Sequence, residues 1–308
     1  YMHFKSEESM MGAFLDFWQA NYPDVITGWN VQLFDMPYIC NRVERILGEK
    51  FTKLLSPWKL VSQREIYIKG RKQFAVDTIG ISCLDYLELY KKFTYTNQES
   101  YRLDHICNVE LGEKKLDHSE YDTFKEFYEN NWQKFIEYNI HDVRLVDKLD
   151  DKMRLIELAY TMAYDAKVNY EDVFSQVRMW DNYIYNELNK RKIAIPPKKE
   201  SATKTEKYAG AYVKEPIPGF YDWVVSFDLN SLYPHLIMQY NISPETLQDT
   251  RHPAITVDKI LEKKVEIDGE YAVCANGAQY CKDKHGFLPE MMQKMYDSRV
   301  IFKKKMIK

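Results

Sequence analysis

The spacing of apolar positions in the first part of the chain predicts alternating helices and strands. Phe14 and Trp18, four residues apart, indicate a first helix, and the apolar segment 24–30 indicates a short buried strand. A second helix is expected next, because Pro37 suits a first helical turn and apolar residues recur at helical spacing after it. A strand followed at once by a helix is typical of an α/β fold.

The middle of the chain alternates between a hairpin pattern and long helical patterns. Two strand-like segments in 65–78 flank the basic turn 69–72, which predicts a β-hairpin. Helices are predicted over 84–90, over 124–164 and over 180–188. We interpret the aromatic residues on one face of the long second helix as core packing.

The last third of the chain changes in composition. Segment 195–207 is polar and bounded by prolines, as in a linker between domains. Segment 223–229 is predicted to be a buried strand, 265–274 has strand character, and a final helix is expected to open at Pro289. The later part of that helix is basic, with Arg299, Lys303, Lys304, Lys305 and Lys308.

Composition supports a packed globular protein and excludes several classes. The 308 residues suggest two domains or parts of domains, at ~150 residues each. A hydrophobic share of 45% and an aromatic share of 15% exclude a disordered or collagen-like chain. The formal net charge of −3 does not indicate a nucleic-acid partner, so any basic surface must be local.

The cysteines, the apolar runs and the ends of the chain restrict the classes of protein that we expect. Five cysteines without framework spacing favour reduced thiols over disulfides or a zinc knuckle. No apolar run reaches the ~18 residues of a membrane span, and the first thirty residues lack a signal-peptide core, so we expect a soluble protein with no membrane association. The chain opens on Tyr1 and its last helix has no stop signal, from which we expect a piece of a longer protein.

Three carboxylates are candidates for chemistry, and each has a simpler structural explanation. Asp35 could cap a helix. Tyr138 and Asp142 share one helix face and could address one ligand, although a surface pair is the commoner outcome. Asp228 could end its strand in an Asx turn, and Tyr233 could simply pack.

Together, the segments around these residues resemble family B DNA polymerases. They occur in this order: Gly28-Trp-Asn-Val-Gln-Leu-Phe-Asp35, Tyr138-Asn-Ile-His-Asp142 and Asp228-Leu-Asn-Ser-Leu-Tyr-Pro234. The first two resemble the second and third motifs of the proofreading 3′–5′ exonuclease, and the last resembles the first motif of the polymerase palm. The similarity to the T-even bacteriophage branch covers nearly the whole chain, and segments 84–93, 96–98, 210–218 and 241–246 are typical of that branch.

The resemblance implies a mixed α/β fold with a ribonuclease H-like exonuclease domain, part of a palm and the first helix of the fingers. The implied divisions are the exonuclease domain without its first strands (1–155), a helical segment returning to the N-terminal domain plus a linker (156–207), the first palm section (208–286) and the start of the fingers helix (287–308). The basic hairpin falls where this branch carries a β-hairpin that helps to separate the primer end, with its register left open.

The resemblance also implies roles for residues of the exonuclease. Asp35 and Asp142 would be two of its four acidic metal ligands, Tyr138 would orient the attacking water, and Asn30 would support them. Two divalent ions can stabilise both the attacking and the leaving oxygen of a phosphoryl transfer. Mg²⁺, which prefers carboxylate oxygens, is the implied cofactor, and Mn²⁺ could substitute for it.

In the palm, the resemblance implies a nucleotide site. Asp228 and the backbone carbonyl of Leu229 would hold metal and triphosphate, and Tyr233 would exclude a ribose 2′-hydroxyl. Arg299 and Lys303 match positions that contact the incoming triphosphate in the T-even bacteriophage branch, and their spacing places both cations on one helix face, as suits an anion. A solvated basic face is the simpler explanation for those two residues.

Some expected signatures are absent from the chain. The Asp-x-Glu motif of the exonuclease does not precede Gly28, and the Tyr-Gly-Asp-Thr-Asp-Ser motif of the palm and the Lys-x₃-Asn-Ser-x-Tyr-Gly motif of the fingers do not occur. Each metal site would therefore lack ligands, and we expect the isolated chain neither to extend nor to degrade DNA efficiently. The implied partners are primer–template DNA, a single-stranded 3′ end, deoxynucleoside triphosphates, a sliding clamp and a single-strand-binding protein, in the cytoplasm of a host cell.

Two other functions remain open from the sequence. The chain could be a stand-alone metal-dependent 3′–5′ exonuclease in which Asp77 or Asp104 replaces the missing ligands. It could also be a non-catalytic DNA-binding module, whose binding would resist metal removal and weaken with salt. Segment 228–234 argues against a nuclease alone, because hydrolysis has no use for a sugar gate.

Overall fold

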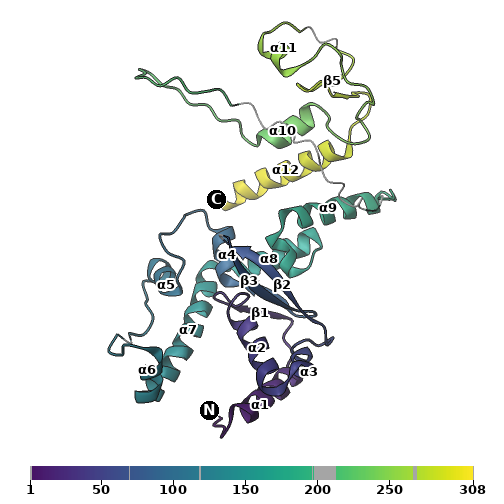
Figure 1. The fold of residues 1–308 in the computed structure, drawn as a ribbon. Coiled ribbons are helices and arrows are strands. Elements are labelled where there is room, and N and C mark those ends of the chain that lie inside the picture. Colours follow the sequence, from purple (N-terminus) through teal and green to yellow (C-terminus); the bar gives the residue numbers. More distant parts are fainter. Residues whose placement is uncertain are drawn as a thin grey trace. The chain divides into compact units, whose positions relative to one another are not determined.

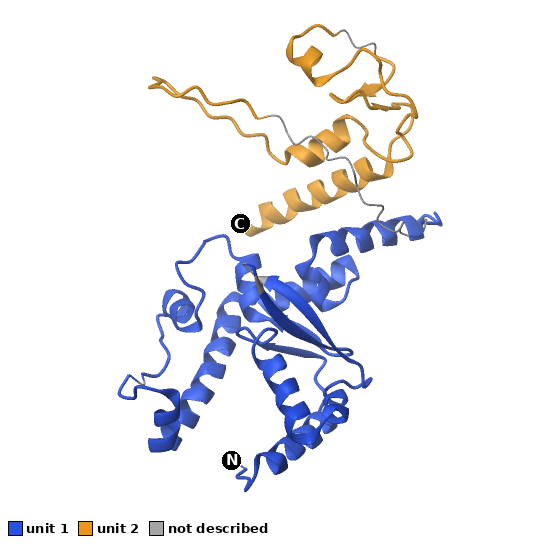
Figure 2. Cartoon of the chain, viewed as in Figure 1, with its two compact units in different colours: residues 1–205 blue, residues 206–308 orange. Residues whose placement is uncertain are grey.

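The computed structural model describes residues 2–68, 70–117, 119–195, 197, 213–265 and 269–307. The chain divides into two compact units, residues 1–205 and residues 206–308, which Figure 2 shows in different colours. Both contain helices and strands, which confirms the predicted mixed α/β class.

The first unit holds most of the regular structure (Figure 1). Its elements are α1 (Glu7–Ala20), β1 (Val25–Gly28), α2 (Asp35–Leu47), α3 (Glu49–Thr52), the 3₁₀ turn η1 (Lys53–Leu55), β2 (Val61–Ile68), β3 (Arg71–Thr78), β4 (Ser82–Asp85), α4 (Tyr86–Phe93), α5 (Leu103–Leu111), α6 (Phe124–Asn130), α7 (Trp132–Met153), α8 (Leu155–Ala166), the 3₁₀ turn η2 (Tyr170–Phe174) and α9 (Gln176–Lys190). The second unit has α10 (Leu232–Gln239), α11 (Val257–Leu261), β5 (Ala272–Val273), β6 (Gln279–Tyr280) and α12 (Phe287–Ile307).

Two strand pairs organise the first unit. β1 and β4 are parallel, with Gly28 opposite Asp85, and β2 and β3 form the predicted hairpin. Apolar side chains pack in two clusters, one where α4, α5, α7 and α8 meet β4 and the other where α1 and α2 meet β3. Because β1 is paired with β4, the turn that follows Gly28 and leads into α2 begins at a fixed position beside the first cluster.

The predicted long helix is divided into α6, α7 and α8. The side chain of Asn131 accepts a hydrogen bond from the Lys134 amide (3.2 Å) and caps α7, while Arg154 adopts a left-handed conformation that ends it. The aromatic face is also only partly core. Phe127 is fully buried, whereas Phe124 and Trp132 are exposed.

The strand predicted over 223–229 is not formed. This segment is irregular, and its large apolar side chains face solvent, Trp223 at 97% and Phe227 at 90% exposure. Figure 1 shows it within an extended arm ahead of α10. A strand needs neighbouring strands for its backbone hydrogen bonds, and no described strand pairs with this segment, so its apolar pattern alone does not produce one.

Other expectations have mixed outcomes. The strand character predicted over 265–274 is confined to β5 among the described residues, and most of the predicted linker 195–207 lies outside them. All five cysteines are free thiols, as predicted. No helix among the residues that the structure describes is long and apolar enough to cross a membrane.

Candidate functional site

Helix α7 places two predicted residues, Tyr138 and Asp142, on one face, and Lys115, which the sequence did not indicate, contacts both of them. The ammonium group of Lys115 donates to the Asp142 carboxylate (2.5 Å) and to the Tyr138 hydroxyl (3.3 Å). Its nitrogen also lies 5.3 Å from the centre of the Tyr138 ring. Leu145 and Leu149 anchor the helix in the core, so this three-residue cluster stands on a rigid element.

Lys115 reaches the cluster from the irregular segment after α5. Its backbone amide donates to the Asp104 carboxylate (2.8 Å), which fixes the segment 27 residues before Asp142. No local pattern marks this lysine, because its partners come from two helices distant in sequence. The same contact occupies Asp104, one of the two substitute metal ligands considered above. The other, Asp77, pairs with Arg64 across the hairpin (2.8 Å).

The electrostatics of the cluster favour an ion pair between Lys115 and Asp142 that leaves one carboxylate oxygen without a partner. Burial works against the charged form of Lys115, but the hydrogen bond and the negative charge of Asp142 outweigh it and raise the pKa of the lysine. The second carboxylate oxygen of Asp142, Oδ1, is buried and has no hydrogen-bond partner. A buried carboxylate oxygen without a partner is a suitable ligand for a hard divalent cation.

Asp35 is the first residue of α2 and lies at the surface. Desolvation by the surrounding protein raises the pKa of its carboxyl group, and a hydrogen bond from its own amide partly offsets this effect. The N-cap of α2 is Phe34, and no side chain accepts a hydrogen bond there. Asp35 is therefore not the cap of this helix, and the turn before it must be held in another way.

A buried carboxylate that the sequence did not reveal holds that turn. Asp85, at the end of β4, accepts hydrogen bonds from the backbone amides of Asn30 (3.0 Å) and Gln32 (3.1 Å) and caps α4 through Leu87 (3.0 Å). Asn30 has a φ of 68°, in the left-handed region. The pattern gave no signal for the contact of Asp85 with this turn, because Asn30 and Gln32 lie more than fifty residues earlier in the chain.

In the second unit, the predicted nucleotide-site residues are accessible. Asp228 and Leu229 lie on the exposed arm, and Tyr233 is the second residue of α10, with 74% of its surface exposed. Arg299 on α12 donates to the hydroxyl of Ser231 (3.3 Å), just before α10. Lys303 is exposed one turn further along α12. The structure thus brings Arg299 to the segment that carries the predicted motif.

Segment 241–246 orients α12 by capping its first turn. Glu245 accepts a hydrogen bond from the Phe287 amide (2.6 Å), and the Asn241 side chain accepts from the Gly286 amide (2.9 Å). A Cβ atom at Gly286 would meet the Cβ of Ser243 at 2.6 Å, so only glycine allows this approach. Through these contacts, segment 241–246 supports a helix that lies much later in the chain.

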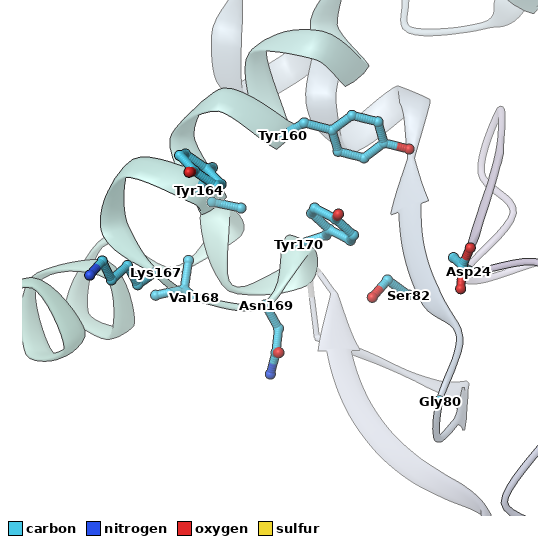
Figure 3. Close-up of a pocket in the computed structure, with 10 residues that line it drawn as sticks. Asp24, Gly80, Ser82, Tyr160, Tyr164, Lys167, Val168, Asn169 and Tyr170 are labelled. Carbon is cyan, nitrogen blue, oxygen red and sulfur yellow. The ribbon is translucent and has the colours of Figure 1, made fainter.

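The predicted ligands do not form complete metal sites. Among the described residues, no group of three or more His, Cys, Asp or Glu side chains could hold a metal ion. The cavities also lie elsewhere. One of about 790 Å³ in the first unit, shown in Figure 3, contains none of the predicted site residues and is lined by Asp24, Gly80, Ser82, Tyr160, Ala163, Tyr164, Lys167, Val168, Asn169 and Tyr170.

Comparison with known proteins identifies the family. Residues 2–106 match the DNA polymerase family B exonuclease domain, and residues 175–308 match DNA polymerase family B. The chain is 41% identical to a DNA-directed DNA polymerase of Escherichia phage RB69 and 36% identical to one of Enterobacteria phage T4, over 97% and 99% of its length. A DNA polymerase of Pyrococcus glycovorans is 27% identical over 98% of it. The chain spans about a third of the length of these relatives, 33%, 34% and 36%. It belongs to DNA polymerase family B.

Proposed function

We propose that this chain supplies parts of two phosphoryl-transfer sites of a replicative DNA polymerase, one for proofreading and one for synthesis. The observation that carries the proposal is the cluster of Lys115, Tyr138 and Asp142, in which one buried carboxylate oxygen has no hydrogen-bond partner. Family B polymerases and their exonucleases depend on metal ions in general, and the substrates implied by the family are DNA and deoxynucleoside triphosphates.

In the exonuclease, Asp35 and Asp142 would hold Mg²⁺, which Mn²⁺ could replace. The bound ions would activate water and stabilise the charge that develops on the phosphodiester at a single-stranded 3′ end. Lys115 keeps one oxygen of Asp142 occupied, so the other, which has no hydrogen-bond partner, would be the one to hold a cation. Tyr138 would orient the attacking water, and Asn30 would support the turn before Asp35. The proofreading proposal thus gives each of these residues one role: holding the cation, orienting the water or supporting the turn.

In the polymerase site, Asp228 and the carbonyl of Leu229 would hold the metal and the triphosphate of the incoming nucleotide. Arg299 and Lys303 lie on one face of α12 and would bind the phosphates, whereas Tyr233 would close the space that a ribose 2′-hydroxyl needs. The exposure of Asp228 and Tyr233 is compatible with contact to a substrate. The primer 3′-oxygen would attack the α-phosphate in this arrangement.

The domain limits given above remain part of the proposal: exonuclease 1–155, returning segment 156–207, palm 208–286 and fingers 287–308. The change of unit between residues 205 and 206 lies close to the limit between 207 and 208. The primer–template duplex, a sliding clamp and a single-strand-binding protein are the proposed partners, with the cytoplasm of a host cell as the location. The hairpin β2–β3 would act at the primer end.

We test the catalytic part by following a 5′-labelled single-stranded oligonucleotide with the purified 308-residue chain in Mg²⁺ and in Mn²⁺. Because each described site has fewer than three acidic ligands, we expect no metal-dependent loss of 3′ nucleotides. The variants Asp35→Ala and Asp142→Ala serve as active-site controls, and Asp16→Ala, at an exposed carboxylate of α1, serves as a matched control outside the site. Degradation that both active-site substitutions abolish, with Asp16→Ala unaffected, would instead establish a stand-alone nuclease.

A non-catalytic DNA-binding module is the second candidate, favoured by the basic residues of the hairpin and of the end of α12. Titration of a fluorescent oligonucleotide with and without EDTA separates the two. Binding that is unchanged by EDTA and falls steeply with salt would favour the module. Binding that Mg²⁺ strengthens, and that Asp142→Ala makes insensitive to Mg²⁺, would favour the polymerase proposal.

A further inference from the structure

Asp85 is a buried carboxylate for which the activity proposed above has no direct use. Only 2% of its surface is exposed, and both of its oxygens accept hydrogen bonds from backbone amides. Oδ1 accepts from Asn30 and from Leu87, both at 3.0 Å, and Oδ2 accepts from Gln32 at 3.1 Å. Asp85 therefore joins the end of β4 to the turn that follows β1.

That turn sets the place of Asp35. Within it, the Phe34 amide donates to the Asn30 carbonyl (3.0 Å), and the Met36 amide donates to the Val31 carbonyl (3.0 Å). Helix α2 begins directly afterwards without a side-chain cap. The position of Asp35, the first residue of α2, thus depends on a turn in which two backbone amides donate hydrogen bonds to Asp85.

The surroundings of Asp85 are rigid. Gly28 and Asp85 face each other in the parallel pair, and the Thr27 hydroxyl donates to the Leu84 carbonyl (2.7 Å) one step earlier. After Gly28, the Trp29 indole donates to the Tyr101 carbonyl (3.1 Å). Burial raises the pKa of Asp85, and the three backbone hydrogen bonds oppose that effect. A carboxylate held in this way has little freedom to follow a displaced turn.

We propose that Asp85 is a positioning residue of the exonuclease site, which holds the turn at Asn30 and Gln32 so that Asp35 can bind a divalent cation. The inference rests on the proposed function, because it takes Asp35 as a metal ligand. The simpler role for Asp85 is capping of α4 alone. The two roles overlap at Oδ1, which serves both the cap and Asn30, and they differ at Oδ2, which serves only Gln32.

The substitution Asp85→Asn separates these roles. An asparagine keeps the Oδ1 acceptor for Leu87 and Asn30 but places an N–H group against the Gln32 amide, where no hydrogen bond can form. An unpaired buried amide costs about 1–3 kcal/mol, so we expect hydrogen exchange at Gln32 to quicken about tenfold or more. Exchange at Leu87 stays slow if the cap is intact. Asp16→Asn is the matched control, because Asp16 is an exposed carboxylate of α1 in the same unit.

The readout specific to a metal ligand is the broadening by Mn²⁺ of amide NMR signals of the full 308-residue chain. In the unchanged chain we expect Mn²⁺ to broaden the signals of Asp35 and Asp142, with reversal by excess Mg²⁺. In Asp85→Asn, half-broadening at Asp35 should require about tenfold more Mn²⁺, whereas Asp142 should respond as before. A purely structural cap would leave both responses unchanged.

The outcomes of the Mn²⁺ experiment distinguish failure of the positioning role from failure of the metal assignment. Unchanged Mn²⁺ broadening at Asp35 in a folded Asp85→Asn chain overturns the positioning role and leaves the proposed function standing. Absence of broadening at Asp35 in the unchanged chain overturns the metal assignment and, with it, the inference. If Asp85→Asn does not fold, Asp85→Ser replaces it, because serine also caps helices and lacks the second acceptor oxygen. The same selective loss at Asp35 is then the supporting result.

Discussion

The two units place their candidate carboxylates in opposite surroundings. Asp142 lies on a helix that is anchored in the core at Leu145 and Leu149, and Lys115 fixes one of its oxygens. Asp228 lies on an exposed, irregular arm whose apolar neighbours face solvent. The first carboxylate is therefore held before any ligand arrives, whereas the second has no such support among the described residues.

The difference between the two carboxylates reflects how helices and strands satisfy their backbone hydrogen bonds. A helix satisfies its own backbone hydrogen bonds and requires only a face against which to pack. A strand depends on other strands for its hydrogen bonds, so an apolar pattern such as that of 223–229 does not define a position by itself. We expect substitutions near Asp142 to be costly and substitutions on the arm to have little effect.

The largest expected effect is in the core beneath Asp142. Leu145→Ala removes a fully buried side chain, and we expect a loss of about 2–5 kcal/mol in the free energy of unfolding of the first unit. Val143→Ala, at an exposed position of the same helix, is the control and should cost far less. Denaturant titration with hydrogen exchange resolved by residue measures both. Equal losses in the two units would show that they do not unfold separately.

The second effect concerns the turn that caps α12. Asn241→Ala removes the hydrogen bonds that its side chain makes with Cys281 (2.7 Å), Lys284 (2.8 Å) and Gly286 (2.9 Å). It also places alanine at a φ of 53°. We expect a loss of about 2–4 kcal/mol in the second unit, measured by denaturant unfolding. Gln293→Ala, on the exposed side of α12, is the control, and an equal loss there would contradict the role of Asn241.

A smaller effect should depend on pH. Burial opposes the charge of Glu245, but hydrogen bonds from Ser243 and from the Phe287 amide outweigh it and lower the pKa of the carboxyl group. A lowered pKa stabilises the fold above the unfolded value of about 4.3 and loses that contribution as pH falls through the folded value. Glu245→Gln should therefore cost less than about 1 kcal/mol at neutral pH and nearly nothing in strong acid. Unfolding curves measured at several pH values test this, and a difference independent of pH would contradict it.

The smallest effect belongs to the arm. Val225→Ser replaces an exposed apolar side chain, and we expect the free energy of unfolding to change by less than about 0.5 kcal/mol. Thermal unfolding of the chain measures the change. A loss comparable with that of Asn241→Ala would mean that the arm is packed in solution, and the contrast between the two units would then disappear.

The sequence predicted those features that depend on neighbours close in the chain. Helical spacing indicated α1, α2, α9 and α12, and the basic turn at 69–72 correctly predicted the hairpin. The pairing of Tyr138 with Asp142 followed from a separation of four residues. The division of the long helix at Asn131 was missed because a capping asparagine can also occur within a helical pattern.

Features that depend on distant partners could not be predicted in this way. Lys115, Asp85 and the cap formed by Asn241 and Glu245 act across roughly 27 to 55 residues, where periodicity carries no information. The strand predicted over 223–229 failed for the related reason that its partners are not specified by its own sequence. Local patterns therefore located the candidate carboxylates, and only the structure identified the residues that hold them.

The side chain of Asn241 also bears on the order in which the second unit folds. Its contacts with Gly286 close a loop of 45 residues, so the first turn of α12 gains its cap only after both ends of that loop have met. The entropy cost of closing a loop rises only slowly with its length, yet it must be met before the contacts form. We therefore expect α12 to become ordered late in folding, after the turn at 241–246.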